Sequence, residues 1–252
     1  IGVLMDERRD TVLEVPDREP DRTAPDGPWN QAMVTDKSYF STGISAFFEM
    51  ATADAVRLLP GHLQPIEINP QRSILNVTVF HFRESEVGPY AELMFSVVVP
   101  PVVGDWGRHP KGGFFPFLAA TSSERSRRYR SELLRIPHYP ENIDVHFVER
   151  PGEVRARVIA EERPAVDLKV TPHVWHSTTH LLHAFMMDGT RRLKADLQIS
   201  GRYTVHEQER GQVTLHPHPM TEALTLDEVS RYPFREHWLK EGCELFHPVE
   251  LL

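Results

Sequence analysis

Apolar and polar residues alternate over several short runs of this chain, a pattern typical of β-strands. Residues 73–80 are rich in β-branched side chains and alternate in part, and residues 90–99 become apolar on both faces towards their end. Both runs predict strands, and the second is expected to lie centrally in its sheet. Further strands are expected at residues 115–120, 143–148, 154–160, 165–170, 180–187, 193–203 and 212–216.

Few segments have the capping and stop signals of helices. Thr52 is placed to cap a short helix that Pro60 stops, and Ser122 or Ser123 is placed to begin a second helix that ends before Pro137. Many short strands with two or three helices predict an α+β fold dominated by antiparallel sheet.

The two ends of the chain differ from its middle. Residues 1–38 are rich in Asp, Arg and Pro, show no sustained period, and are interpreted as an extended arm across the domain or a neighbouring subunit. Residues 39–252 are expected to form one domain, in which residues 226–252 form a short helix and a packed extension.

Composition narrows the classes of function. The net charge of −8 argues against a nucleic-acid surface, which needs a clustered basic excess. The basic run at residues 125–135 has two interpretations, a solvated helix face or the mouth of a site for an anionic substrate. Cys243 is the only cysteine, so an intrachain disulfide is excluded. Without a signal pattern or a run long enough to cross a bilayer, we expect a soluble cytoplasmic protein that does not bind membranes.

Two motifs in order along the chain resemble a known family. Gly88-Pro89-Tyr90-Ala91-Glu92 is followed by Glu132-Leu133-Leu134-Arg135-Ile136-Pro137-His138, and Leu59-Pro60-Gly61-His62-Leu63-Gln64-Pro65 precedes both. This set is similar to the acetoacetate decarboxylase superfamily over roughly residues 39–216. The resemblance implies a closed, cone-like and mainly antiparallel β-barrel with a few flanking helices, a homo-oligomer, and an interior site for a small carbonyl or keto-acid substrate.

The resemblance also indicates where this chain departs from the family. The family's catalytic lysine, which forms a Schiff base with the keto acid, is replaced by His138, and Tyr139 follows it. Histidine forms no stable iminium but can exchange protons near neutral pH. We therefore expect His138 to act as an acid or base, with Glu92 and Glu132 positioning it or the substrate. Tyr90, Tyr139 and Glu49 are expected to contact the substrate.

Four histidines, His173, His176, His180 and His183, are spaced so that a continuous helix would place them on one face as a zinc or iron site. On a strand, His180 and His183 would point to opposite faces. The interrupted pattern favours a strand at residues 180–187 and no metal. We expect no cofactor either, because neither a phosphate-binding loop nor a dinucleotide fingerprint occurs.

The sequence predicts an atypical acetoacetate decarboxylase-like enzyme, lyase-like in class, that uses acid/base chemistry of the lyase, hydratase or isomerase type. Two alternatives stay open. The barrel could bind a small molecule without catalysis, or Lys169 or Lys194 could have taken over the Schiff base.

Overall fold

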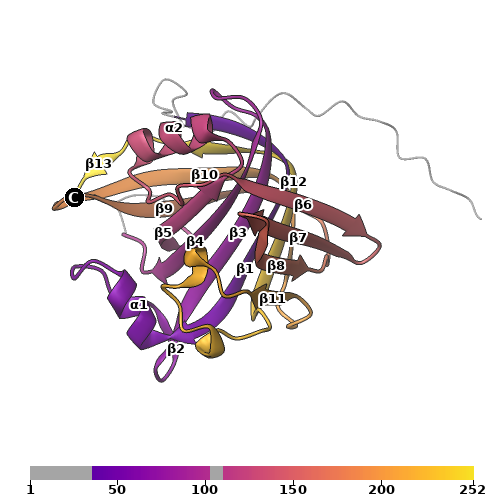
Figure 1. The fold of residues 1–252 in the computed structure, drawn as a ribbon, viewed down its shortest axis with the longest axis horizontal. Helices are drawn as coiled ribbons and strands as arrows, with labels where there is room; N and C mark the ends of the chain where they lie inside the picture. Colours follow the sequence, from indigo (N-terminus) through magenta and orange to yellow (C-terminus); the bar gives the residue numbers. More distant parts are fainter. Residues whose placement is uncertain (1–35, 103–109) are drawn as a thin grey trace, which may run out of the picture. The chain divides into compact units, whose positions relative to one another are not determined.

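A computed structural model describes residues 36–102 and 110–252 of the chain. Figure 1 shows a protein built mainly from strands. The strands are β1 (Asp36–Ala51), β2 (Glu67–Asn69), β3 (Arg72–Glu84), β4 (Tyr90–Val99), β5 (Gly113–Thr121), β6 (Ile143–Arg150), β7 (Glu153–Ala160), β8 (Arg163–Val170), β9 (His176–Asp188), β10 (Arg191–His206), β11 (Gln212–Leu215), β12 (Arg235–Phe246) and β13 (Glu250–Leu251). The helices are α1 (Thr52–Leu58), α2 (Glu124–Leu134) and the short 3₁₀ turns η2 (Pro219–Thr221) and η3 (Leu226–Glu228).

The larger sheet closes on itself as a barrel. Its strands follow the order β1-β12-β10-β9-β5-β4-β3, and β3 then pairs with β1. All of these pairings are antiparallel except β5–β9, where Gly113 and Phe114 lie parallel to His183 and Ala184. The expectation of a closed, mainly antiparallel barrel with flanking helices is confirmed, with one short parallel pairing that makes the barrel mixed.

A second sheet covers part of the barrel's outer surface. It has the order β11-β8-β7-β6. Successive side chains of β1 point to opposite sides of the barrel wall. Ala46 and Phe48 therefore join the hydrophobic core that also contains Val158 of the second sheet. Ser45 and Phe47 point the other way and line an internal cavity.

Helix α2 lies across one end of the barrel (Figure 1). The side chain of Ser123 accepts a hydrogen bond from the Ser126 backbone N–H at its amino end, as a capping residue does. Ser126, Arg130 and Leu134 are its buried residues, and their spacing of four places them on one face of the helix. This face brings Arg130 into the barrel.

The structure corrects three sequence predictions. Thr52 does not cap α1, because Ala51 occupies the N-cap position and no side chain caps it. The extension predicted after residue 226 is instead the barrel strand β12. Strand β1 begins at Asp36, within the segment assigned to the arm, while residues 1–35 of that arm lie outside the described residues.

Candidate functional site

The barrel encloses a cavity of about 520 Å³. Alternate residues of β4, namely Glu92, Met94, Ser96 and Val98, line its wall. Much of the remaining lining is apolar, and Phe47, Phe80, Phe114, Leu182, Ile199 and Phe246 contribute to it. Cavities of this size usually hold a drug-sized molecule through apolar contacts and a few placed polar groups.

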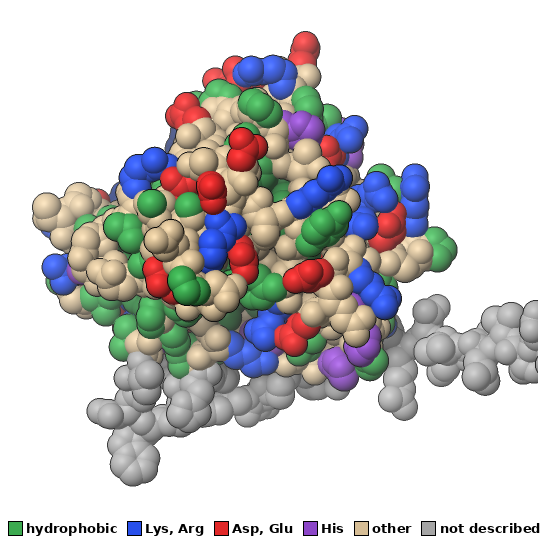
Figure 2. Space-filling model, turned by 90° about the horizontal axis from the view of Figure 1, so that it is seen from below, with side chains coloured by type: hydrophobic (Ala, Val, Ile, Leu, Met, Phe, Trp, Pro, Cys, Tyr) green, Lys and Arg blue, Asp and Glu red, His purple; other side chains and the backbone are tan. Residues whose placement is uncertain are grey.

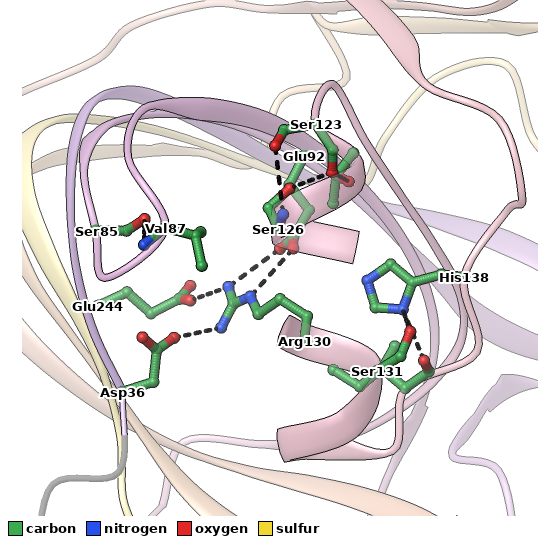
Figure 3. Close-up of polar contacts among 12 residues, drawn as sticks. Asp36, Ser85, Val87, Glu92, Ser123, Ser126, Arg130, Ser131, His138 and Glu244 are labelled. Carbon is green, nitrogen blue, oxygen red and sulfur yellow. Dashed lines mark hydrogen bonds and ion pairs between the residues drawn. The ribbon is translucent and has the colours of Figure 1, made fainter. Parts of the chain in front are cut away.

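A buried arginine stands beside the carboxyl groups of this cavity. Arg130 of α2 is 1% exposed, and its guanidinium donates to three carboxylates (Figure 3). It reaches Glu244 Oε1 at 2.7 Å, Asp36 Oδ2 at 2.9 Å and both oxygens of Glu92 at 3.3 and 3.4 Å. The Phe246 ring packs against the guanidinium, with its centroid 4.9 Å from the Cζ atom of Arg130. Glu92 and Glu244 line the cavity, so the arginine fixes two carboxyl groups in its wall.

The charges of this cluster do not balance. One guanidinium faces three carboxyl groups, and like charges held close together favour retention of a proton. Burial, together with the nearby charge of Glu92 and against the opposing effect of Arg130, raises the pKa of Glu244 to about 7. Glu244 is therefore suited to give and take a proton near neutral pH.

Two histidines and a tyrosine form a second cluster of polar side chains in the cavity lining. His180 packs edge-on against Tyr203, with ring centroids 4.7 Å apart, and stacks with His237 at 6.4 Å. Burial lowers the pKa of His180 to about 4 and that of His237 to about 3. Both imidazoles are therefore uncharged at neutral pH. The Nε2 atom of His180 is buried and has no hydrogen-bond partner within residues 36–102 and 110–252.

Charged residues with exposed side chains occur elsewhere on the lining. Lys111, Glu207 and Arg235 are exposed, and Arg235 donates to Glu207 at 2.6 Å. They mark where the cavity meets solvent. On the surface shown in Figure 2, acidic and basic side chains are interspersed, so this face presents no large basic patch.

The structure places His138 outside the cavity lining. Its Nδ1 atom lies 2.7 Å from the Ile136 carbonyl and 2.9 Å from the Ser131 hydroxyl, and its ring lies on the Ser131 side of α2 (Figure 3). Burial lowers the pKa of His138. Its Nε2 atom is buried without a partner among the described residues.

The other predicted site residues are dispersed, and of the predicted set only Glu92 lines the cavity. Glu132 is exposed on α2. The Tyr90 ring is buried against the Phe82 ring, with the two ring centroids 4.8 Å apart. Tyr139 donates to Glu161 at 2.5 Å. Glu49 accepts hydrogen bonds from Asn69 and Arg72 at the end of β1.

His180 and His183 lie on a strand, the second of the two structures considered for them from the sequence, and not on a helix. Residues 180–187 lie in β9, which confirms the predicted strand. His180 and His183 both line the cavity, and His183 also accepts a hydrogen bond from the Val102 backbone N–H and lies 3.4 Å from Asp196. In the described part of the chain, no group of three or more His, Cys, Asp or Glu residues is arranged to hold a metal ion.

The lysines considered as replacements lie away from the cavity lining. Lys194 is paired with Asp196 at 2.8 Å and Glu250 at 3.1 Å, and Lys169 lies in β8 of the second sheet. Lys111 is the lysine of the described chain that lines the cavity.

No family model and no curated protein matches this sequence. Solved structures do. An acetoacetate decarboxylase from Legionella pneumophila matches with a TM-score of 0.59 and 11% identity, covering 92% of this chain and 93% of that one. An acetoacetate decarboxylase-like enzyme from Sphingomonas wittichii RW1 matches with a TM-score of 0.58 and 14% identity, covering 86% and 92%. The chain has the acetoacetate decarboxylase fold.

A third match to this fold is the enduracididine biosynthesis enzyme MppR in complex with pyruvate. Its TM-score is 0.57 at 14% identity, with 90% of this chain and 94% of that one covered. The resemblance stated from the two sequence motifs is thus confirmed for the fold. In this version of the acetoacetate decarboxylase fold, the buried charged cluster joins α2 to β1, β4 and β12. Among the helices of the described residues, none is long and apolar enough to cross a membrane.

Sequence reasoning missed most of the cavity's polar groups. Arg130 carried a usable signal, because it lies four residues before Leu134 and four after Ser126 on one helical face. Glu244 and His237 carried no comparable local signal. Their strand was not predicted, and the partners that explain a buried charge at residue 244 lie far away in the sequence.

Proposed function

We propose that this chain is an enzyme that transfers protons to and from an enolisable carbonyl compound bound in the barrel cavity, without a lysine iminium. The observation that supports this most is the pairing of Glu92 and Glu244 in the cavity wall around Arg130. Acid/base catalysis on a carbonyl needs a group that removes a proton from carbon and one that donates to oxygen.

Glu244 and Glu92 can divide these roles. Burial raises the pKa of Glu244, so its protonated form can donate a hydrogen bond or a proton to the carbonyl oxygen. Glu92 accepts hydrogen bonds from Arg130 and can accept a proton from the carbon next to the carbonyl. The enol formed in this way regains a proton at carbon and returns its oxygen proton to Glu244. The net result is proton exchange or isomerisation, with both carboxyl groups restored.

This proposal assigns proton transfer to the cavity carboxyls rather than to His138. The reason is geometric, because a catalytic acid or base must come within hydrogen-bond reach of the substrate. The predicted role of His138 remains a prediction that its own variant tests.

A non-catalytic barrel that binds a small molecule is the second candidate. The apolar lining and the two uncharged histidines favour it, since such a cavity can hold a ligand by burial and hydrogen bonds alone. A binding protein would protect its ligand and leave the protons next to the carbonyl unexchanged.

Proton NMR in D2O separates these candidates. Carbonyl compounds incubated with the protein are followed for loss of the signal from protons next to the carbonyl. An enzyme accelerates the loss above the rate in buffer and in heat-denatured protein. A ligand that binds, as shown by a raised melting temperature, but exchanges at the buffer rate would reject the enzyme and favour the binding barrel.

A further inference from the structure

The cavity's size and charges restrict which carbonyl compound it can hold. With a volume of about 520 Å³, it has room for at least about 15 groups the size of a water molecule, each of which takes about 30 Å³ in the liquid. Pyruvate and acetoacetate are much smaller and would leave apolar wall in contact with water. A ligand that fills the cavity therefore needs a bulky apolar body.

The cavity is also poorly suited to a buried anion. Its arginine neighbour, Arg130, is already shared among three carboxylates, and two of these, Glu92 and Glu244, face the cavity. A carboxylate placed beside them would meet like charges in a desolvated wall. The cations Lys111 and Arg235 lie at exposed positions of the lining, where water screens their attraction, and Arg235 is already paired with Glu207.

His180 supplies a second polar contact at a defined distance from Glu244. Ile199 of β10 pairs with His180 on one side and with Glu244 on the other. Two strand spacings therefore separate the Cα atoms of His180 and Glu244, which makes them about 10 Å apart. Because the buried Nε2 atom of His180 has no protein partner in the described residues, a ligand group can complete its hydrogen bonding.

We propose that the cavity binds an uncharged, bulky ketone, typically one with an aromatic ring, whose carbonyl lies at Glu244 and whose uncharged hydrogen-bonding group lies at His180. This inference rests on the proposed function for the role of the carbonyl and narrows its substrate class. It favours a neutral ketone over a keto acid, and a ring-sized ligand over a pyruvate-sized one.

Isothermal titration calorimetry with matched ligands tests the charge preference. Benzylacetone and benzylpyruvate share the same ring and spacer and differ in a methyl group against a carboxylate. We expect benzylacetone to bind the full-length protein at least about tenfold more tightly than benzylpyruvate, and pyruvate to bind more weakly than benzylacetone. Equal or tighter binding of benzylpyruvate, or no binding of benzylacetone at millimolar concentration, would overturn the proposal.

The proposed contact between the ligand and His180 is tested by adding a single hydroxyl group to the ligand. Hydroxybenzylacetone, with its phenol opposite the ketone chain, should bind about three- to tenfold more tightly than benzylacetone. His180→Phe should abolish this gain, so that hydroxybenzylacetone and benzylacetone bind this variant with equal affinity. A gain that persists in His180→Phe would show that the hydroxyl lies elsewhere.

Two neighbouring leucines test whether the ligand occupies the cavity. Leu182 lines it, whereas Leu181, equally half-buried on β9, does not. Leu182→Trp should weaken benzylacetone about tenfold or more by filling space, and Leu181→Trp should leave its affinity unchanged. Circular dichroism of both variants checks folding, and Leu182→Phe serves if Leu182→Trp does not fold. Equal effects of the two substitutions would place the ligand outside the cavity.

The same samples separate failure of this inference from failure of the proposed function. Tight binding of benzylacetone without proton exchange in D2O would leave the ligand class standing and reject catalysis. Proton exchange in pyruvate, without binding of benzylacetone, would keep catalysis and reject the ligand class.

Discussion

The guanidinium of Arg130 donates to Glu244 Oε1 across 2.7 Å and joins α2 to the barrel strand β12, 114 residues further along the chain. Because Arg130 also holds Asp36 and Glu92, a single side chain connects the helix to three barrel strands. Folding and the arrangement of the cavity carboxyls should therefore depend on the same residue.

Removal of this arginine should be costly. Arg130→Met would leave three buried carboxyl groups without their cation, and breaking a buried ion pair from one side typically costs about 3–5 kcal/mol. Urea unfolding at neutral pH measures the loss. Arg128→Met is the matched control, since Arg128 forms an exposed ion pair with Glu124, and we expect it to change stability by no more than about 0.5 kcal/mol. Similar losses in the two variants would contradict a central role for Arg130.

Stability should also depend on pH through His237. Burial holds the pKa of His237 at about 3, whereas the pKa of an unfolded histidine is about 6.5. Below pH 6.5 the histidine therefore binds a proton in the unfolded state but not in the folded state. Stability falls for this reason as the pH drops towards 3. The contribution of His237 to the free energy of unfolding is fully present above pH 6.5. Below that pH it is lost by at most about 1.4 kcal/mol per pH unit.

Thermal unfolding of His237→Leu between pH 4 and 7 checks this expectation. The variant should lose less stability than the wild type as the pH falls. His176→Leu, at an exposed histidine of β9, should retain the wild-type profile. A His237→Leu profile parallel to the wild type would show that His237 takes up a proton in the folded state as readily as in the unfolded state.

His138→Ala should leave catalysis largely intact. His138 is held by Ser131 and the Ile136 carbonyl rather than lining the cavity, so its loss should reduce turnover by no more than about threefold, well below the 10²–10⁴-fold typical of a catalytic acid or base. Steady-state kinetics on a carbonyl substrate provides the measurement. A loss of that larger size with unchanged substrate affinity would restore His138 as the catalytic residue predicted from the sequence.

No substrate iminium should form. Lys194 is engaged with two carboxylates and Lys169 lies on the second sheet, while Lys111 is exposed at the cavity lining. Intact mass spectrometry after incubation with pyruvate or benzylacetone and borohydride should show the unmodified mass. An adduct mapped to Lys111, Lys169 or Lys194 would favour Schiff-base chemistry instead.

The sequence was informative wherever local pattern decides structure. The run at residues 90–99 that becomes apolar on both faces located β4, and the serine cap before the basic run located α2. The two long strands β1 and β12 were not predicted. Their buried faces include Asp36, Glu236 and Glu244, which do not look like core residues in a local window.

The site was harder to predict because its contacts are long-range. The burial of Glu244 is explained by its ion pair with Arg130. The burial of Glu236 is explained by the hydrogen bond that the Thr171 hydroxyl donates to it. Glu92 was found because it belongs to the family motif. His138 was chosen for the position it occupies in that motif, but side-chain direction, which only the folded chain sets, leaves it outside the cavity lining.

The exchange of protons next to the carbonyl of benzylacetone in D2O, compared between the wild type and Glu244→Gln, tests the central claim most directly. Glu241→Gln, which changes an exposed glutamate of the same strand, is the control. If Glu244 is the group that protonates the carbonyl oxygen, Glu244→Gln should slow exchange by about 10²–10⁴-fold while benzylacetone still binds, and Glu241→Gln should exchange at the wild-type rate. Wild-type exchange in a folded, ligand-binding Glu244→Gln protein would contradict the account.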